Sequence, residues 1–416
     1  MKEVVKHTAG LLSANIVSQV IGLLVYPILT RIYRPEDFGL LNLFLSISGI
    51  LVLLSTAEYY NAIVLPKSDR KAAGVVGLCA LILIMTSVAV GCSVPFARGI
   101  AYLFKAPELS SYWWLMPFSV LFGGGWNILN YWYIRKQQFV RISGYQVSQS
   151  IFSSAGKFIG RSGFLIIATV VGQFLSMCLS LILAARKGVI RLIHPDRATI
   201  REVAKEYQNF PLYNLPRGFI NLVIGQLPVL VLTPVFGTRL VGFWGMAVLL
   251  GFAPISTISR SLYQTLYQHI NARVQQRLAI MPIMRKFTGL ILGVGVPVFA
   301  GLYWVLPMLT GLLLGNEWCV SGEYIRWMLP WVLCSLLSAS TTFLEGIFYQ
   351  QKIGFFFEVL LSALRVIGVL CGVWAEDFTI AIAGYSIGST LVIGAQYIWL
   401  LSIARKYDRS LSELSV

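Results

Sequence analysis

Residues 163–185 read GFLIIATVVGQFLSMCLSLILAA, 23 residues without a single charged side chain. A continuous apolar run of about 18 residues or more is long enough to cross a bilayer as an α-helix. The apolar residues do not alternate with polar ones over about ten residues, which excludes the strands of a membrane β-barrel. Residues 163–185 therefore predict a transmembrane helix.

Similar stretches run along the whole chain, separated by short charged segments. The twelve predicted spans are 8–32, 38–64, 74–96, 111–134, 141–160, 163–185, 210–233, 240–265, 286–311, 324–348, 354–374 and 378–401. Of the 416 residues, 57% are hydrophobic and 12% are charged, whereas soluble domains have about 45–50% and 25%. This composition excludes an ordinary soluble enzyme, a disordered chain and a nucleic-acid-binding domain. The predicted fold class is an all-α polytopic membrane protein with about 12 transmembrane helices.

The chain has a net charge of +16, and the distribution of its Lys and Arg residues predicts its orientation in the membrane. With the N-terminus inside, 22 of the 33 Lys and Arg residues fall in inner segments and 6 in outer segments. Cytoplasmic loops of membrane proteins collect Lys and Arg, so both termini are predicted to be cytoplasmic. The longest outer loop, about 97–110, is too short to fold alone, and the inner segment 186–209 can form at most a helix on the membrane surface. We therefore expect no catalytic domain, and a transporter rather than an enzyme.

The two halves of the sequence resemble each other. At an offset of 203 the matches are Val20-Ile21-Gly22 with Val223-Ile224-Gly225, Leu29-Thr30 with Leu232-Thr233, Tyr33 with Phe236, and Gly39 with Gly242. At an offset of 216, Tyr133 and Phe139 fall on Tyr349 and Phe355. Six spans per half predict a parallel repeat about an axis along the membrane normal. We therefore expect two six-helix bundles, 1–190 and 210–416, which a basic linker at 191–209 joins and which face a central cavity.

Polar residues recur along several spans at steps of 3 and 4, which places each set on one helix face. The sets are Asn15, Gln19, Gly22, Tyr26 and Thr30; Gln146, Ser150, Ser153, Lys157 and Arg161; Asn214, Arg217, Asn221, Gly225 and Pro228; and Glu358, Ser362 and Arg365. Faces of small polar residues also form ordinary helix–helix seams. A charge facing lipid at mid-depth costs about 2.5–3.5 kcal/mol or more, so the faces with Lys or Arg favour a water-filled cavity.

We rank the charged residues as candidate site residues by their predicted depth in the membrane. Arg365 lies near the middle of its span and is the first candidate for substrate binding, while Lys157 lies nearer the outer end of its span, where it can also reach the surface. Arg217, Arg260, Glu58 and Glu345 fall in the cytoplasmic third of their spans. They form either neutralising Glu–Arg pairs or a vestibule for an anionic headgroup, with the two carboxylates as gating or ion-coupling sites.

The scattered cysteines and histidines have none of the spacings of a metal site or a disulfide framework. We therefore expect no metal, no catalytic residue and no cofactor, apart from a gradient of H⁺ or Na⁺ as a candidate energy source.

Two motif groups carry a family resemblance. The first is LTRIYRPEDFGL at 29–40 followed by EYYNAIVLP at 58–66, and the second is GNEW at 315–318 followed by SGEYIR at 321–326. These motifs resemble bacterial polysaccharide transporters, the O-antigen repeat-unit flippases of the multidrug/oligosaccharidyl-lipid/polysaccharide exporter superfamily. Ser321 stands where that family usually has Ala.

The resemblance implies translocation of an oligosaccharide repeat unit, linked to undecaprenyl pyrophosphate, across the bacterial inner membrane by alternating access. The product would be O-antigen of lipopolysaccharide or a related surface polysaccharide. Implied partners are the lipid-linked oligosaccharide and the bilayer, with a polysaccharide polymerase and a chain-length regulator as further candidates, but no nucleic acid. The excess of bases in the spans fits a pyrophosphate independently of the resemblance.

Three alternatives stay open. A multidrug/cation antiport exporter shares the architecture, but acidic residues should dominate its cavity. A lipid II flippase typically has two further helices. A membrane-embedded glycan polymerase or ligase needs a large outer loop, and no loop here is long enough.

Overall fold

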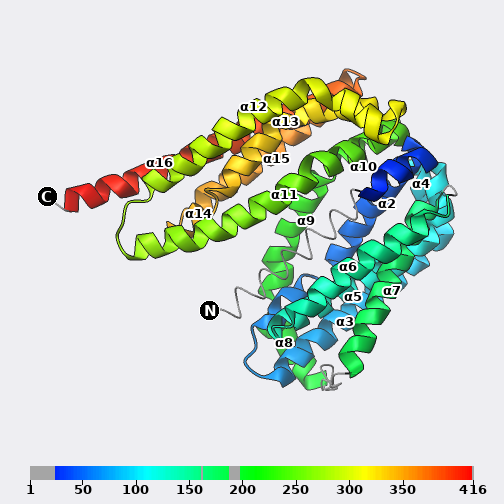
Figure 1. The fold of residues 1–416 in the computed structure, drawn as a ribbon. Helices are drawn as coiled ribbons and strands as arrows, with labels where there is room; N and C mark the ends of the chain where they lie inside the picture. The colour runs from blue at the N-terminus through cyan, green and yellow to red at the C-terminus, as the bar shows by residue number, and fades with distance from the viewer. Residues whose placement is uncertain (1–23, 161–162, 187–196, 415–416) are drawn as a thin grey trace. The chain divides into compact units, whose positions relative to one another are not determined.

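The structure, a computed structural model, describes residues 24–160, 163–186 and 197–414. All regular elements in these ranges are helical, which confirms the predicted all-α class. The chain divides into two compact units, an N-terminal unit that ends at Gly242 and a C-terminal unit that begins at Phe243. Figure 1 traces their helices along the chain.

The helices of the N-terminal unit pack around a core to which η1, α3, α5 and α8 contribute buried residues. Its helices are α2 (Pro35–Leu54), α3 (Asp69–Cys92), α4 (Ala97–Leu103), α5 (Met116–Arg135), α6 (Phe139–Lys157), α7 (Phe164–Arg186), α8 (Arg197–Glu206), α9 (Leu215–Gly225) and α10 (Leu227–Phe236). Short 3₁₀ turns η1 (Tyr59–Val64), η2 (Val94–Phe96) and η3 (Pro107–Leu115) and the π-helical turn η4 (Phe210–Asn214) join them. Ile63, Val75, Cys79, Val120 and Val203 are fully buried in one core cluster.

The C-terminal unit contains longer helices. These are most of α11 (Thr238–Gln275), then α12 (Met281–Leu314), α13 (Cys319–Ala339), α14 (Leu344–Ile347), α15 (Gln351–Trp374) and α16 (Phe378–Leu414), with a 3₁₀ turn η5 (Asn316–Trp318) before α13. Ile270, Ile280, Phe343, Leu344 and Leu400 are buried together where the end of α11, the start of α12, α14 and the second half of α16 meet.

Among the described residues, eight helical segments are long and apolar enough to cross a membrane, or nine if α9 and α10 form one bent span. The predicted span 210–233 is this pair, bent by 44°. Gly225, which ends α9, and Pro228, which is in the first turn of α10, favour a break because neither residue supports a continuous helix.

Three other predicted spans differ for separate reasons. The spans 111–134 and 141–160 are the helices α5 and α6, which are more polar than the other eight; α6 alone contains five serines and two glutamines. The span 8–32 lies mostly outside the described residues, and its described part, 24–32, is helical. The expected outer loop 97–110 is itself helical, since it contains α4 and the start of η3.

The N-terminal unit extends past the boundary expected at residue 190. It includes α9 and α10 because both pack on α2. Within the segment expected as a linker, 191–209, the described part forms the amphipathic helix α8, which packs on α3 through the buried residues Thr199 and Val203. The division into bundles 1–190 and 210–416 stays a prediction.

The repeat that pairs Gly39 with Gly242 appears in the structure as a contact. The beginnings of α2 and α11 cross at these two glycines, and the contact is symmetric. A Cβ built on Gly39 would lie 2.6 Å from the carbonyl carbon of Thr238, and one on Gly242 would lie 2.8 Å from that of Pro35. The same repeat pairs Pro35 with Thr238, so the two backbones meet through equivalent atoms. Only glycine allows so close an approach.

The predicted offset of 216 is wrong by one helical turn. Gln137 and Tyr349 both have positive φ, 54°, and both lie two residues before the next helix, α6 or α15. These two positions are therefore equivalent, whereas the predicted offset pairs Gln137 with Ile353, which lies inside α15. Tyr133 and Tyr349 share a residue type but not a place in the fold, since Tyr133 lies within α5.

Candidate functional site

Arg365 projects from the middle of α15 and is tied to α16. Its Nε donates a hydrogen bond to Ser389 Oγ at 2.9 Å. The Ser389 hydroxyl in turn donates to the carbonyl oxygen of Tyr385 at 2.7 Å, and the Ser389 side chain is fully buried. The rotation of the guanidinium is therefore fixed by α16.

Two aromatic rings enclose the same guanidinium. Its Cζ lies 4.8 Å from the ring centroid of Tyr385 on α16 and 5.2 Å from that of Trp331 on α13. Both rings are held from behind by α11: Phe252 packs on Trp331 at 4.4 Å and Trp244 on Tyr385 at 6.1 Å between centroids. We call Arg365, Trp331, Tyr385 and Ser389 the arginine cage.

The arginine cage leaves part of the guanidinium available. Among the described residues, Arg365 donates only through Nε, so both Nη groups are open for a ligand. Burying a cation at mid-membrane costs at least about 2.5–3.5 kcal/mol, whereas a cation–π contact returns about 0.5–2 kcal/mol. A planar guanidinium with two open nitrogens matches a phosphate or carboxylate through paired hydrogen bonds. The cage is therefore suited to an anion.

The other two predicted residues of the C-terminal unit lie elsewhere in it. Arg260 is exposed on α11. Glu345 is the second residue of α14, where its Oε1 accepts a hydrogen bond from Gln396 Nε2 at 2.7 Å. Its other oxygen packs directly against Gly354 on α15, so a side chain at that position would displace the Glu345 carboxylate. Glu345 thus joins α14, α15 and α16.

The remaining three predicted residues lie in the N-terminal unit. Lys157 is half-buried at the last position of α6, and its carbonyl oxygen accepts a hydrogen bond from Tyr33 Oη at 2.7 Å. Arg217 is exposed on α9. The six predicted residues thus divide equally between the two units.

Glu58 is the most buried acidic residue in the described part of the chain, with 8% of its surface exposed. It sits between α2 and η1 with φ of +63°, a conformation that non-glycine residues seldom adopt. Its carboxylate accepts hydrogen bonds from Tyr60 Oη and Asn61 Nδ2. Helix α9 passes close by, since a Cβ on Gly218 would lie 3.5 Å from Glu58 Oε1. The structure therefore brings Glu58 next to the helix that carries Arg217.

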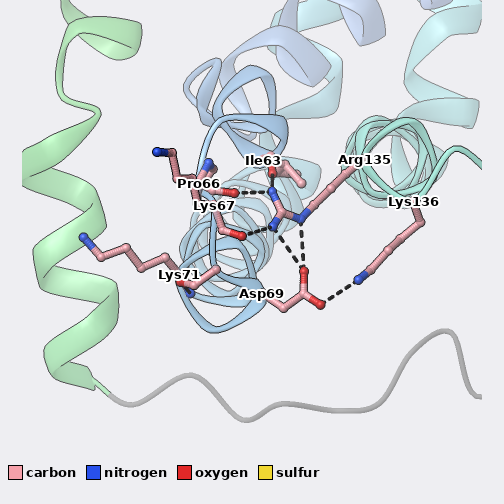
Figure 2. Close-up of polar contacts among 8 residues, drawn as sticks. Ile63, Pro66, Lys67, Asp69, Lys71, Arg135 and Lys136 are labelled. Carbon is pink, nitrogen blue, oxygen red and sulfur yellow. Dashed lines mark hydrogen bonds and ion pairs between the residues drawn. The ribbon is translucent and has the colours of Figure 1, made fainter.

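Sequence reasoning missed Arg135, which holds the chain between η1 and α3 (Figure 2). Its guanidinium donates to the carbonyl oxygens of Ile63, Pro66 and Lys67, and its Nη2 lies 3.1 Å from Asp69 Oδ1. Lys136 Nζ binds the other Asp69 oxygen at 2.7 Å. Only 11% of the Arg135 side chain is exposed. This arginine clasp fixes the end of α5 to the start of α3.

Lys71 fastens α8 to the same end of the unit. Its Nζ lies 2.7 Å from Glu202 Oε1 and 3.0 Å from Glu206 Oε2. The Lys71 ammonium holds the pKa of the Glu206 carboxyl below its ordinary value. Because these side chains are exposed, each pair contributes little on its own.

The charged residues of the clasp can be seen in the sequence, but their pairing cannot. Arg135 is the last residue of the helix α5 and Lys136 follows it, while Asp69 is the first residue of the apolar helix α3 and lies 66 residues before Arg135 in the sequence. A count of basic residues on each side of the membrane treats Arg135 and Lys136 as ordinary loop charges. Only the fold shows that they meet Asp69.

The chain is similar to known proteins in sequence and in fold. A sequence profile of the polysaccharide biosynthesis protein family matches residues 28–323. No curated protein matches the chain in sequence.

Solved structures share the fold. The chain is similar to the lipid II flippase MurJ in its inward closed conformation, with a TM-score of 0.72 and 14% identity over 96% of this chain and 89% of MurJ. It is also similar to an inward-facing multidrug resistance MATE family transporter of the MOP superfamily, with a TM-score of 0.68 and 14% identity over 96% of both chains. Since the profile covers most of its length, this chain belongs to the polysaccharide biosynthesis protein family, and it is a multi-span membrane protein with the fold of MOP superfamily transporters.

Proposed function

We propose that this protein is a flippase that moves an oligosaccharide repeat unit, linked to undecaprenyl pyrophosphate, across the bacterial inner membrane by alternating access. The repeat unit belongs to O-antigen or a related surface polysaccharide. Membership of a polysaccharide biosynthesis family supports a glycan cargo. The similarity in fold to a lipid II flippase supports a cargo that is carried on a lipid.

The arginine cage is the observation that carries this proposal. Its open Nη groups suit the pyrophosphate that links the glycan to its lipid. The rings of Trp331 and Tyr385 hold the guanidinium on two sides, so the charge is fixed before the substrate arrives. A cation-binding pump would need an acidic group at this place.

The other predicted residues have roles in the same proposal. The exposed cations Arg217 and Arg260 attract the anionic headgroup at the cytoplasmic side, and Lys157 contacts it later in the cycle. The buried carboxylate of Glu58 and the half-buried carboxylate of Glu345 are sites for a coupling ion, H⁺ or Na⁺. A polysaccharide polymerase and a chain-length regulator would then receive the translocated unit.

Reconstituted transport tests the role of Arg365. The full chain in proteoliposomes would receive a fluorescent undecaprenyl-pyrophosphate-linked oligosaccharide, and an added glycosidase would report how much glycan changes side. Losing hydrogen bonds to a charged group costs about 1.5–3 kcal/mol, so Arg365→Ala should slow transport at least about tenfold. Arg365→Lys keeps the charge without the planar fork and should be intermediate.

Arg98→Ala is the matched control, because Arg98 is an exposed arginine on α4 that the proposal does not use. It should transport like the unchanged protein. If Arg365→Ala transports at the same rate as Arg98→Ala at equal reconstitution, the assignment of the arginine cage is wrong. In cells, the same comparison would be made on surface polysaccharide at matched expression.

A cation or drug antiporter is the second candidate. The buried carboxylate of Glu58, with hydrogen bonds from Tyr60 and Asn61, is the observation that favours it. An antiporter should move a cationic dye against an ion gradient and lose that activity in Glu58→Gln. It should keep that activity in Arg365→Ala, the reverse of what a flippase predicts.

A further inference from the structure

The hairpin of α6 and α7 is tight at one end and open at the other. A Cβ on Gly156 would lie 2.8 Å from Ala168 Cβ, and one on Gly172 would lie 2.7 Å from the backbone nitrogen of Ser153. Toward the start of α6, a Cβ on Gly144 would meet no atom within 4 Å. The two helices therefore touch near Ser153 and Gly172 and separate toward the start of α6.

A cavity of about 300 Å³ occupies the open end. Its polar lining consists of Arg141, Tyr145, Ser148, Ser176 and Ser180. No Asp or Glu is among its lining residues, so its one formal charge is positive. We call this cavity the α6–α7 pocket.

Residues behind the pocket hold its walls in place. Tyr145 stacks on Trp126 of α5 with parallel rings 3.4 Å apart between centroids. Tyr133, also on α5, shares a hydrogen bond of 2.9 Å with the Ser180 hydroxyl, and the guanidinium carbon of Arg141 lies 5.6 Å from the Tyr133 ring. The pocket is therefore preformed, and a ligand need not order these side chains.

Two donors in this wall have no acceptor. Ser176 is fully buried and its Oγ has no hydrogen-bond partner among the described residues, and the same is true of the buried Nη1 of Arg141. A buried donor without an acceptor costs about 1–3 kcal/mol, and more when it is charged. A serine hydroxyl and a guanidinium that both lack an acceptor point to an anionic oxygen ligand.

The mouth of the pocket is apolar. Val140, Leu179 and Leu183 line it and are 74%, 38% and 47% exposed. Leu179 and Leu183 lie on α7, one of the helices apolar enough to cross the membrane, so their exposed faces lie toward lipid chains. Arg141 is the third residue of α6, which is the depth at which headgroups lie if α6 crosses the membrane. The ligand therefore combines an anionic group with hydrocarbon.

We propose that the α6–α7 pocket binds the phosphate of an anionic membrane phospholipid. The phosphate accepts from Arg141 and Ser176, and the acyl chains pass over Leu179 and Leu183. The pocket has no carboxylate to pair with a choline ammonium, so it selects phosphatidylglycerol over phosphatidylcholine. This site is in the N-terminal unit and does not depend on the arginine cage or on the transported cargo.

Native mass spectrometry of the full chain released from detergent micelles tests the proposal. Defined amounts of phosphatidylglycerol, phosphatidylcholine or diacylglycerol with identical chains would be added, and bound lipid counted per protein. We expect phosphatidylglycerol to bind most tightly. Arg141→Gln should weaken it about tenfold or more, and Ser176→Ala about threefold, as expected for a charged and a neutral hydrogen bond.

Arg70→Gln is the matched control, because Arg70 is an exposed arginine in the first turn of α3, outside the pocket. Binding that falls equally in Arg70→Gln and Arg141→Gln would show general attraction to a basic surface and overturn the site. Equal binding of phosphatidylglycerol and diacylglycerol would overturn the role of phosphate. Displacement of the lipid by millimolar inorganic phosphate would overturn a lipid as the source of that phosphate.

Arg141→Lys covers the case in which Arg141→Gln fails to fold. It keeps the charge and should retain part of the preference for phosphatidylglycerol over diacylglycerol. Transport of the lipid-linked oligosaccharide would be measured on the same variants. Loss of phospholipid binding with normal transport supports this site, whereas failure of the proposed function would leave phospholipid binding unchanged.

Discussion

Replacing Gly39 or Gly242 by alanine should separate α2 from α11. Each new Cβ would lie 2.6–2.8 Å from a backbone carbonyl carbon of the other helix. Each Cβ would also overlap the carbonyl oxygen of Thr238 or Pro35, and carbon atoms pack best at about 3.5–4.0 Å, so the helices must move apart by more than about 1 Å. Overpacking of this kind costs about 1–3 kcal/mol, and the better helix propensity of alanine returns about 0.5–1 kcal/mol. We expect a net loss of at least about 1–2 kcal/mol from either substitution, because the overlapping atoms belong to the backbone.

The contact also predicts how the two substitutions combine. Once one alanine has pushed the helices apart, the second Cβ meets less resistance, because both clashes are relieved by the same movement. The double variant should therefore lose clearly less stability than the sum of the two single variants. Thermal unfolding of the purified chain in detergent, followed by intrinsic tryptophan fluorescence, would measure all three.

Gly49→Ala is the matched control, because Gly49 lies in the same helix and a Cβ there meets no atom within 4 Å. It should be neutral or slightly stabilising through helix propensity. The reasoning is refuted if Gly39→Ala unfolds at the same temperature as Gly49→Ala. It is also refuted if the effects of Gly39→Ala and Gly242→Ala are fully additive.

Three further predictions concern the other sites. Tyr385→Leu should weaken binding of the lipid-linked oligosaccharide about twofold to thirtyfold through the lost cation–π contact. Tyr385→Phe, which keeps the ring, should change binding little, and the fluorescent substrate would report both variants. Arg135→Gln should speed hydrogen exchange in the segment between η1 and α3 by about tenfold while α12 exchanges as before. Glu206 has a lowered pKa, so its contribution to holding α8 is present above the ordinary carboxyl pKa of about 4.3 and is lost as pH falls further. Lys71→Met should remove this pH dependence from hydrogen exchange in α8, and an unchanged profile would contradict it.

The helices could be predicted from the sequence because apolar length alone identifies a membrane helix. That signal finds α7, α12 and α15 to within a few residues. It does not report where a helix ends beyond the membrane, so α16 continues past its predicted end at 401 as far as Leu414. It also cannot report that α9 and α10 pack on α2, because an apolar face does not specify its partner.

The candidate site could be predicted only in part for the same reason. Arg365 stands out because a charge in the middle of an apolar run is costly wherever it faces. Trp331 and Tyr385 come from two other helices and look like any aromatic residues in a membrane protein. The sequence repeat pairs Gly39 with Gly242, but it does not show that these two glycines are in contact.

The arginine clasp also sets an order of events during synthesis. The carbonyl groups of Ile63 and Lys67 emerge from the ribosome 72 and 68 residues before Arg135, which later binds them. At about 5–20 residues per second, this leaves an interval of roughly 4–14 s. Throughout it, α3 enters the membrane while its first turn still lacks the partner that fixes it. The end of α5 thus supplies the contact that fixes the start of α3, and a truncated chain that ends before residue 135 would lack that contact.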